Sequence, residues 1–383
     1  MKLHARGIAS SISSLIVGEI AHTLTVANGK ERILSVNDGY NSAAIGPAAI
    51  ISSLPFEGLP QEFKLLPSVH SAGALDHLAE GDIVLIKPDG ELHTLYRRQS
   101  DHNALFVTDR CNSNCLMCSQ PPKDRDDIGF FLEINMRLLE LIPKDIHILG
   151  ITGGEPTLLG PRLYFMLRKI KDRLPDTEIH MLTNGRAFAW MNYAELVASV
   201  DNPRMVYAIP LYSDYYALHD YIVQAKDAFS QTTLGIHNLA RLNQRIEIRI
   251  VLHKQVIPRL KQLANFIYRN MPFVDHVALM GLEYTGYTPH NDPLLWIDPY
   301  DYVEQLNDAV EFLALNGVNV SIYNLQLCLL PKHLWKYCRK SISDWKQIYI
   351  DECMQCDWRE ECGGLFMSST RKHSSHIAPM KKQ

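Results

Sequence analysis

The stretch that decides the fold is Phe106-Val107-Thr108-Asp109-Arg110-Cys111-Asn112-Ser113-Asn114-Cys115-Leu116-Met117-Cys118. Its apolar start has the composition of a short buried strand, and three cysteines then follow with Cys-x3-Cys-x2-Cys spacing. A structural zinc site normally takes four protein ligands, and no fourth cysteine lies nearby. A four-iron cluster held by three thiolates would instead leave one iron open to a small molecule. The spacing alone also permits three buried or zinc-bound cysteines.

A second motif, Ile151-Thr152-Gly153-Gly154-Glu155-Pro156, ends the next predicted strand. In βα repeats, sites form at the carboxyl ends of the parallel strands. We expect the two glycines to let a ligand approach the backbone closely, and Glu155 to accept a hydrogen bond from an ammonium group. The two motifs together favour a cofactor site over three merely structural cysteines.

From Ala104 onward, short apolar runs alternate with amphipathic segments, as in βα units of a parallel sheet. Helical periodicity occurs within 163–174 and 260–267, and Asp298-Pro299 is a start signal for a further helix that ends before Gly317. The predicted strands are Leu105–Thr108, Ile146–Thr152, Glu178–Thr183, Met205–Pro210, Ile246–Leu252 and His276–Leu279. Six repeats predict an α/β fold with a partial (β/α)6 barrel.

Residues 1–100 predict a β-rich domain, because alternating runs are joined by turn signals. One hairpin is expected from His22–Val26, Asn28-Gly29 and Arg32–Val36; a second is expected from Asp82–Lys87, Pro88-Asp89-Gly90 and Glu91–Arg97. We therefore divide the chain into 1–100, a core at 101–290 and a third region at 291–383. The basic stretch 371–383 is expected to be a loose terminus.

Composition excludes several classes of protein. With 46% hydrophobic and 21% charged residues in 383, extended disorder is ruled out. A net charge of -4 gives no broad basic field for nucleic acid or anionic lipid. No apolar run approaches a membrane helix or signal peptide, which predicts a cytoplasmic protein without a membrane partner. All eight cysteines fall in two clusters, which favours metal binding over disulfides.

The two motifs resemble those of the radical S-adenosylmethionine (SAM) superfamily. The resemblance implies that Cys111, Cys115 and Cys118 bind a [4Fe-4S] cluster whose open iron chelates SAM. It implies a SAM-binding set made up of Gly153, Gly154, Glu155, Pro156, Met117, Thr183, Asn184 and Ser213. Taken alone, Thr183-Asn184-Gly185 is also ordinary turn chemistry, and Ser213 is also a plausible solvated loop serine.

The sequence departs from many peptide-modifying relatives at one position. In His219-Asp220-Tyr221-Ile222-Val223, a valine stands where those relatives carry an arginine. Arg249, on the fifth predicted strand, is the candidate contact for the SAM carboxylate if its side chain points inward; a structural ion pair is the alternative. Glu283 after the sixth strand is similarly ambiguous.

The second cysteine cluster reads Cys328-x9-Cys338, then Cys353-x2-Cys356-x5-Cys362-Gly363-Gly364. It resembles the SPASM or twitch domains of radical SAM maturases, which hold auxiliary iron–sulfur clusters. Five cysteines are one more than a single fully ligated [4Fe-4S] cluster needs, so we expect one auxiliary cluster. Cys353, Cys356 and Cys362 are the expected ligands, and Cys328 and Cys338 compete for the fourth place. A structural zinc ribbon is the alternative.

The chain as a whole is similar to the HxsC-type maturases of His-Xaa-Ser repeat peptide systems, with 111–122 as the most specific stretch. The resemblance implies reductive cleavage of SAM to a 5'-deoxyadenosyl radical, which abstracts hydrogen from a ribosomally made precursor peptide. It implies a flavodoxin or ferredoxin donor and a partner radical SAM maturase, and it requires no catalytic side chain beyond the cofactor ligands. The alternatives are a radical SAM enzyme acting on a small molecule or a folded protein, and a non-catalytic scaffold that binds a leader peptide by strand addition.

Overall fold

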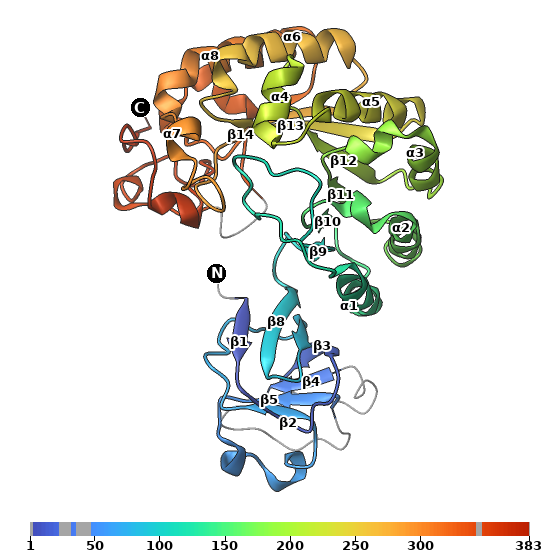
Figure 1. The fold of residues 1–383 in the computed structure, drawn as a ribbon. Helices are drawn as coiled ribbons and strands as arrows, with labels where there is room; N and C mark the ends of the chain where they lie inside the picture. Colours follow the sequence, from blue (N-terminus) through green and yellow to red (C-terminus); the bar gives the residue numbers. More distant parts are fainter. Residues whose placement is uncertain (1–2, 23–31, 36–46, 342–346, 383) are drawn as a thin grey trace.

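The computed structural model describes residues 3–22, 32–35, 47–341 and 347–382. These residues form two sheets of eight strands each, and Figure 1 shows the N-terminal sheet as a separate blue unit beside the larger α/β unit. No helix among the described residues is long and apolar enough to cross a membrane.

The N-terminal sheet has the strand order β1-β8-β7-β3-β4-β5-β6-β2. Its strands are β1 (His4–Arg6), β2 (Ile8–Ser10), β3 (Ile16–Ala21), β4 (Arg32–Ser35), β5 (Ala49–Ile51), β6 (Ser68–His70), β7 (Ile83–Ile86) and β8 (Glu91–Tyr96). The two end strands, β1 and β2, are consecutive in the chain on either side of Gly7, so the sheet closes on itself. A Cβ at Gly7 would lie 2.6 Å from the carbonyl oxygen of His70, which explains the glycine at this closure.

The second predicted hairpin is confirmed, because β7 and β8 pair antiparallel. For the first hairpin, the Asn28-Gly29 turn and most of its first arm lie outside the described residues. Its second arm forms β4, which pairs in parallel with β3 rather than antiparallel. Because the sheet is closed, the two ends of its strand order meet at Gly7. This leaves little open edge for the strand addition expected of a peptide scaffold.

The second sheet is entirely parallel and follows chain order from β9 to β16. Its strands are β9 (Ala104–Phe106), β10 (Ile148–Thr152), β11 (Glu178–Leu182), β12 (Met205–Pro210), β13 (Arg245–Leu252), β14 (His276–Gly281), β15 (Val320–Tyr323) and β16 (Cys338–Arg339). The six predicted strands are all present, within two residues at most of their ends. Two short strands, β15 and β16, extend the sheet beyond the expected boundary at residue 290.

The helices are α1 (Ile128–Leu141), α2 (Pro161–Arg173), α3 (Met191–Ala198), α4 (Tyr216–Val223), α5 (Ala228–Arg241), α6 (Leu260–Asn270), α7 (Asp292–Leu295) and α8 (Val303–Leu315). The periodicities at 163–174 and 260–267 correspond to α2 and α6, and the predicted third helix is α8. Its start signal is realised, since the Asp298 side chain accepts from the amide of Tyr300 at 3.0 Å. In Figure 1 the helices lie along the outside of the parallel sheet.

Alternate residues of each parallel strand face the helices, as the two-residue period of a strand requires. On β13, Ile246, Ile248 and Ile250 belong to the main apolar core with the helices. Arg245, Glu247 and Arg249 therefore face the opposite side, which we call the concave face. A parallel sheet covered by helices on one side is consistent with the predicted partial barrel.

The two sheets are joined by direct contacts. Arg98, just after β8, makes a two-pronged ion pair with Asp145, with N–O distances of 2.9 and 3.0 Å. Arg137 on α1 donates to the carbonyl of Leu15 at 3.0 Å. Tyr96 of β8 also packs into the main core of the α/β unit. The N-terminal sheet is thus packed against α1.

Candidate functional site

The three-cysteine loop leaves the carboxyl end of β9, and its start is fixed by Asp127. That carboxylate accepts from the Thr108 hydroxyl at 2.6 Å and from the Asp109 amide at 2.9 Å. Burial raises the pKa of Cys111 to about 12 and raises the pKa values of Cys115 and Cys118 as well; mutual repulsion adds to the shift at Cys111 and Cys115. The three cysteines are each half-buried, and the repulsion among their thiolates shows that the sulfurs lie near one another.

Distant parts of the chain hold this loop by its backbone. The amides of Asn114 and Leu116 donate to the carbonyls of Val223 and Ile222 at 3.0 and 2.9 Å. On the other side, the Asn291 side chain donates to the Leu116 carbonyl at 2.8 Å.

The loop's last cysteine is fixed in the same way. The amide of Tyr287 donates to the Cys118 carbonyl at 2.9 Å, next to Gly286. A Cβ at Gly286 would lie only 2.1 Å from that same oxygen, and its φ is +60°. Position 286 therefore requires glycine.

The Gly-Gly-Glu-Pro motif packs directly on the cysteine loop. The amides of Gly154 and Glu155 donate to the carbonyls of Thr108 and Arg110 at 2.7 and 2.8 Å. A Cβ at Gly154 would lie 2.0 Å from the Arg110 oxygen. In the structure the small size of these glycines admits the backbone of the neighbouring loop, and the close approach of a ligand stays a prediction. The physical reason is that β9 and β10 are adjacent parallel strands, so the segments after them must share one space.

Glu155 is 1% exposed and fully engaged at one oxygen. Its Oε1 accepts from the amide and hydroxyl of Thr157, at 3.0 and 2.6 Å, and from the Thr183 hydroxyl at 2.7 Å. Its Oε2 accepts from the Asn184 amide at 2.7 Å. The carboxylate therefore ties the end of β10 to the end of β11, and only Oε2 has capacity for another donor.

Arg186 is a site residue that sequence reasoning missed. Its Nε donates to the Gln231 side chain at 2.7 Å, and its Nη1 donates to the Asn112 carbonyl and, at 3.2 Å, to the Ser113 hydroxyl. Asn184 adds a hydrogen bond to the Asn112 side chain at 2.6 Å. The only sequence signal for Arg186 was its position directly after Thr183-Asn184-Gly185. Nothing in the sequence indicates that it contacts Asn112 and Ser113, more than 70 residues earlier.

Three other predicted site residues, Met117, Pro156 and Ser213, are buried. The side chain of Met117 packs in the main core, and Pro156 is the buried first residue of a 3₁₀ turn. Ser213 is fully buried, and its hydroxyl accepts from the Tyr215 amide at 3.0 Å, so the solvated-loop alternative is wrong.

Arg249 points to the concave face, as a SAM contact there would require. There its Nη2 lies 3.1 Å from the Met280 sulfur. Its Nε lies 3.6 Å from a carboxylate oxygen of Glu247, which is the structural ion pair we considered.

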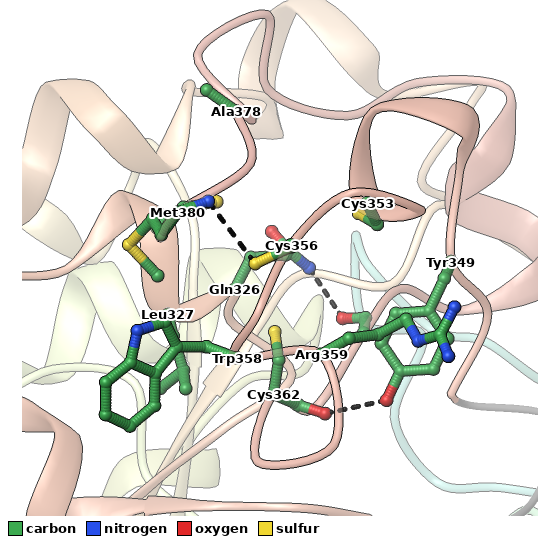
Figure 2. A pocket seen from close by; sticks show the side chains of 12 residues that line it. Gln326, Leu327, Tyr349, Cys353, Cys356, Trp358, Arg359, Cys362, Ala378 and Met380 are labelled. Atoms are coloured by element: carbon green, nitrogen blue, oxygen red, sulfur yellow. Dashed lines mark hydrogen bonds between the residues drawn. The ribbon is translucent and has the colours of Figure 1, made fainter. Parts of the chain in front are cut away.

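Four of the five later cysteines line one pocket, shown in Figure 2. They are Cys328, Cys353, Cys356 and Cys362. Cys338 at the start of β16 is not among the lining residues. The geometry therefore favours Cys328 over Cys338 as the fourth member of the set.

The stretch after Arg371 is not a loose terminus over the part that is described. The Met380 amide donates to the Cys356 sulfur at 3.4 Å, and its carbonyl accepts from the Asp357 amide at 2.9 Å. The ammonium of Lys382 lies 3.1 Å from Glu361. The sequence prediction was wrong because Lys381 and Lys382, taken as solvated, have acidic partners on the cysteine-bearing segment, and Lys372 pairs with Asp292.

In the described ranges, no group of three or more His, Cys, Asp or Glu side chains is arranged around a single metal ion. The donors at the two cysteine sites are thiols, three in one place and four in the other. Thiolates are the ligands of iron–sulfur clusters, and a three-thiol set leaves one iron of a four-iron cluster open. In donor chemistry, the two sets fit such clusters.

Residues 105–267 match the family model described as the Radical SAM superfamily. This segment contains the three-cysteine loop and the Gly-Gly-Glu-Pro motif. The family implies a [4Fe-4S] cluster and SAM.

Among curated proteins, the chain is 25% identical over 166 residues to the GTP 3',8-cyclase of Sulfurimonas denitrificans, covering 42% of this chain and 50% of that protein. It is 24% identical over 264 residues to the GTP 3',8-cyclase of Campylobacter curvus, covering 63% of this chain and 76% of that protein. The chain spans about half the length of the first of these relatives. Among solved structures, Streptococcus suis SuiB bound to S-adenosylmethionine is similar with a TM-score of 0.47 and 14% identity, covering 58% of this chain and 50% of that one.

Proposed function

We propose that the chain is a radical SAM peptide maturase of the HxsC type, with one auxiliary [4Fe-4S] cluster. The observation that carries the proposal is the second, four-thiol pocket beside the radical SAM domain. Four thiols match the ligand count of a fully ligated cluster, whereas the three-thiol loop matches a cluster with an open iron. This combination is what the resemblance to peptide maturases implies.

In this proposal the bound cluster and SAM supply the 5'-deoxyadenosyl radical that abstracts hydrogen from the peptide. The residues of the chain hold and orient them. Cys111, Cys115 and Cys118 are the cluster ligands, and Arg186 fixes the loop that carries them. The free capacity of Glu155 Oε2 suits an ammonium group such as that of SAM. The backbone contacts across the loop give the rigidity that positioning requires.

The concave face supports a polar substrate without a large net negative charge. Arg249 lies 3.6 Å from a carboxylate oxygen of Glu247, whereas the pair of Arg245 and Glu178 lies at the amino ends of the strands, away from the cysteine loop. Burial raises the pKa of Glu247, but hydrogen bonding by His276 and the charge of Arg249 outweigh it, so the net shift is downward and the carboxylate stays ionised. Paired charges of both signs suit a peptide better than a triphosphate, which needs unpaired cations.

A second candidate is a radical SAM enzyme acting on a small molecule, and the matches to GTP 3',8-cyclases favour it. The Campylobacter curvus match is the more extensive, since it covers 63% of this chain. For a nucleotide substrate, the ion pairs of the concave face would have to open to free their arginines.

One experiment separates the two candidates. The anaerobically reconstituted protein is incubated with SAM and a strong reductant, together with either a His-Xaa-Ser repeat precursor peptide or GTP. We expect 5'-deoxyadenosine in proportion to a change in peptide mass, and unchanged GTP. Consumption of GTP without peptide modification would favour the small-molecule enzyme over the peptide maturase. The peptide is also tested with flavodoxin or ferredoxin in place of the chemical reductant, with and without a partner maturase.

A further inference from the structure

The four-cysteine pocket is crossed by a short segment, Ile377–Lys382, which we call the strap. Ala378 and Met380 both line the pocket, and Figure 2 shows the dashed hydrogen bond from Met380 to Cys356. The Met380 amide donates to the Cys356 sulfur at 3.4 Å, so a backbone amide of this segment points at one of the four cysteine sulfurs.

Both ends of the strap are anchored. At one end, Ile377 is buried in a small core with Leu329 and Leu365, against which Cys328 and Cys353 pack. At the other end, Lys381 donates to the Gln355 carbonyl at 2.7 Å, and the Lys382 amide donates to Asp357 at 2.9 Å. Between the anchors, Ala378 and Pro379 are exposed on their outer side. The strap thus has solvent on one side and cysteine sulfurs on the other.

We propose that the strap is a cover for the auxiliary cluster that raises its reduction potential and shields it from solvent. This rests on the proposed function, because it requires a cluster in the four-cysteine pocket. Reduction adds negative charge to a cluster, and the Met380 amide dipole aimed at the Cys356 sulfur stabilises that charge. Hydrogen bonds to sulfur and solvent exposure are two of the factors that set cluster potentials.

The test uses the full chain with Cys111, Cys115 and Cys118 replaced by alanine, so that only the auxiliary cluster gives a signal. Met380→Pro removes the amide donor to Cys356, whereas Met380→Ala keeps it. We expect a lower midpoint potential for Met380→Pro in a redox titration followed by electron paramagnetic resonance, and an unchanged one for Met380→Ala.

A second variant keeps the backbone donors and weakens an anchor. The double change Lys381→Ala and Lys382→Ala should speed the loss of iron to a chelator in air by about two- to tenfold, because both lysine side chains hold this end of the strap through weak surface contacts. The control is Lys226→Ala, because Lys226 is exposed and distant in sequence.

Equal potentials for the two Met380 variants, or equal iron loss in the lysine variant and its control, overturn the strap proposal but leave the auxiliary cluster in place. Absence of iron in the four-cysteine pocket of the parent protein, or zinc in its place, overturns both the strap and the auxiliary cluster.

Discussion

The two cysteine sites of this chain are held in opposite ways. The three-cysteine loop is fixed by residues from distant elements, such as Arg186, Val223 and Asn291. The four-cysteine pocket is built by residues within 326–380. The first site therefore depends on the assembled parallel sheet, whereas the second depends mainly on its own segment and the strap.

This difference teaches how each site relates to solvent and ligand. The loop offers three thiols, which would leave one iron of a four-iron cluster open to bind a ligand. The pocket offers four thiols and adds a backbone donor to the Cys356 sulfur, which suits a closed cluster that only transfers electrons or stabilises the domain. The following predictions test that contrast, beginning with the largest expected effect.

Replacing Cys111, Cys115 and Cys118 together by alanine should abolish 5'-deoxyadenosine formation while leaving about four of about eight irons per chain. The reason is that the two sites share no ligand. Iron analysis and SAM turnover of the reconstituted protein are the measurements. Loss of all iron would show that the second site depends on the first.

Cys356→Ala should remove the auxiliary cluster, so that iron falls to about four per chain, whereas Cys338→Ala should keep about eight. Cys356 lines the pocket and receives the Met380 amide, and Cys338 does neither. Iron content and cluster absorption distinguish the two variants. Equal losses in both would place Cys338 among the ligands.

Arg186→Ala should lower the rate of SAM cleavage by roughly 10- to 100-fold, since hydrogen bonds from a charged group contribute about 1.5–3 kcal/mol. Arg186→Lys keeps the charge but loses the geometry that reaches both Gln231 and Ser113, so we expect partial recovery. The iron content at the four-cysteine pocket should stay constant. A rate equal to that of the unmodified protein would contradict the role of Arg186.

Asn291→Ala should have the smallest effect. It removes one neutral hydrogen bond to the Leu116 carbonyl, worth about 1 kcal/mol, so SAM cleavage should fall no more than about fivefold. Asn316→Ala is a matched control, because Asn316 donates to a carbonyl of its own helix at the same 2.8 Å distance. An equal change in SAM cleavage in both variants would show that Asn291 does not act through the cysteine loop.

Sequence patterns predicted the six strands from β9 to β14 and the helices α2, α6 and α8, because each has a clear apolar period. They missed β15 and β16, which have only four and two residues. Such short strands carry too few positions for a period to show, and their pairing depends on the sheet beside them.

The cysteines and the Gly-Gly-Glu-Pro motif could be found from the sequence because residue type and spacing alone identify them. The partners of Glu155 and the role of Arg186 could not, since they depend on which strand ends become neighbours in space. The sequence could not decide between Cys328 and Cys338 for the same reason, because which of them lies beside Cys353 depends on how the chain folds.

The closure of the N-terminal sheet at Gly7 has a consequence for synthesis on the ribosome. The strands on either side of Gly7 pair with β6 and β8, and the register joins His4 to His93. At about 5–20 residues per second, the ribosome needs roughly 5–20 s to reach those partners after making β1. During that interval β1 and β2 are made but unpaired. The closed N-terminal sheet is therefore complete only when β8 has left the ribosome.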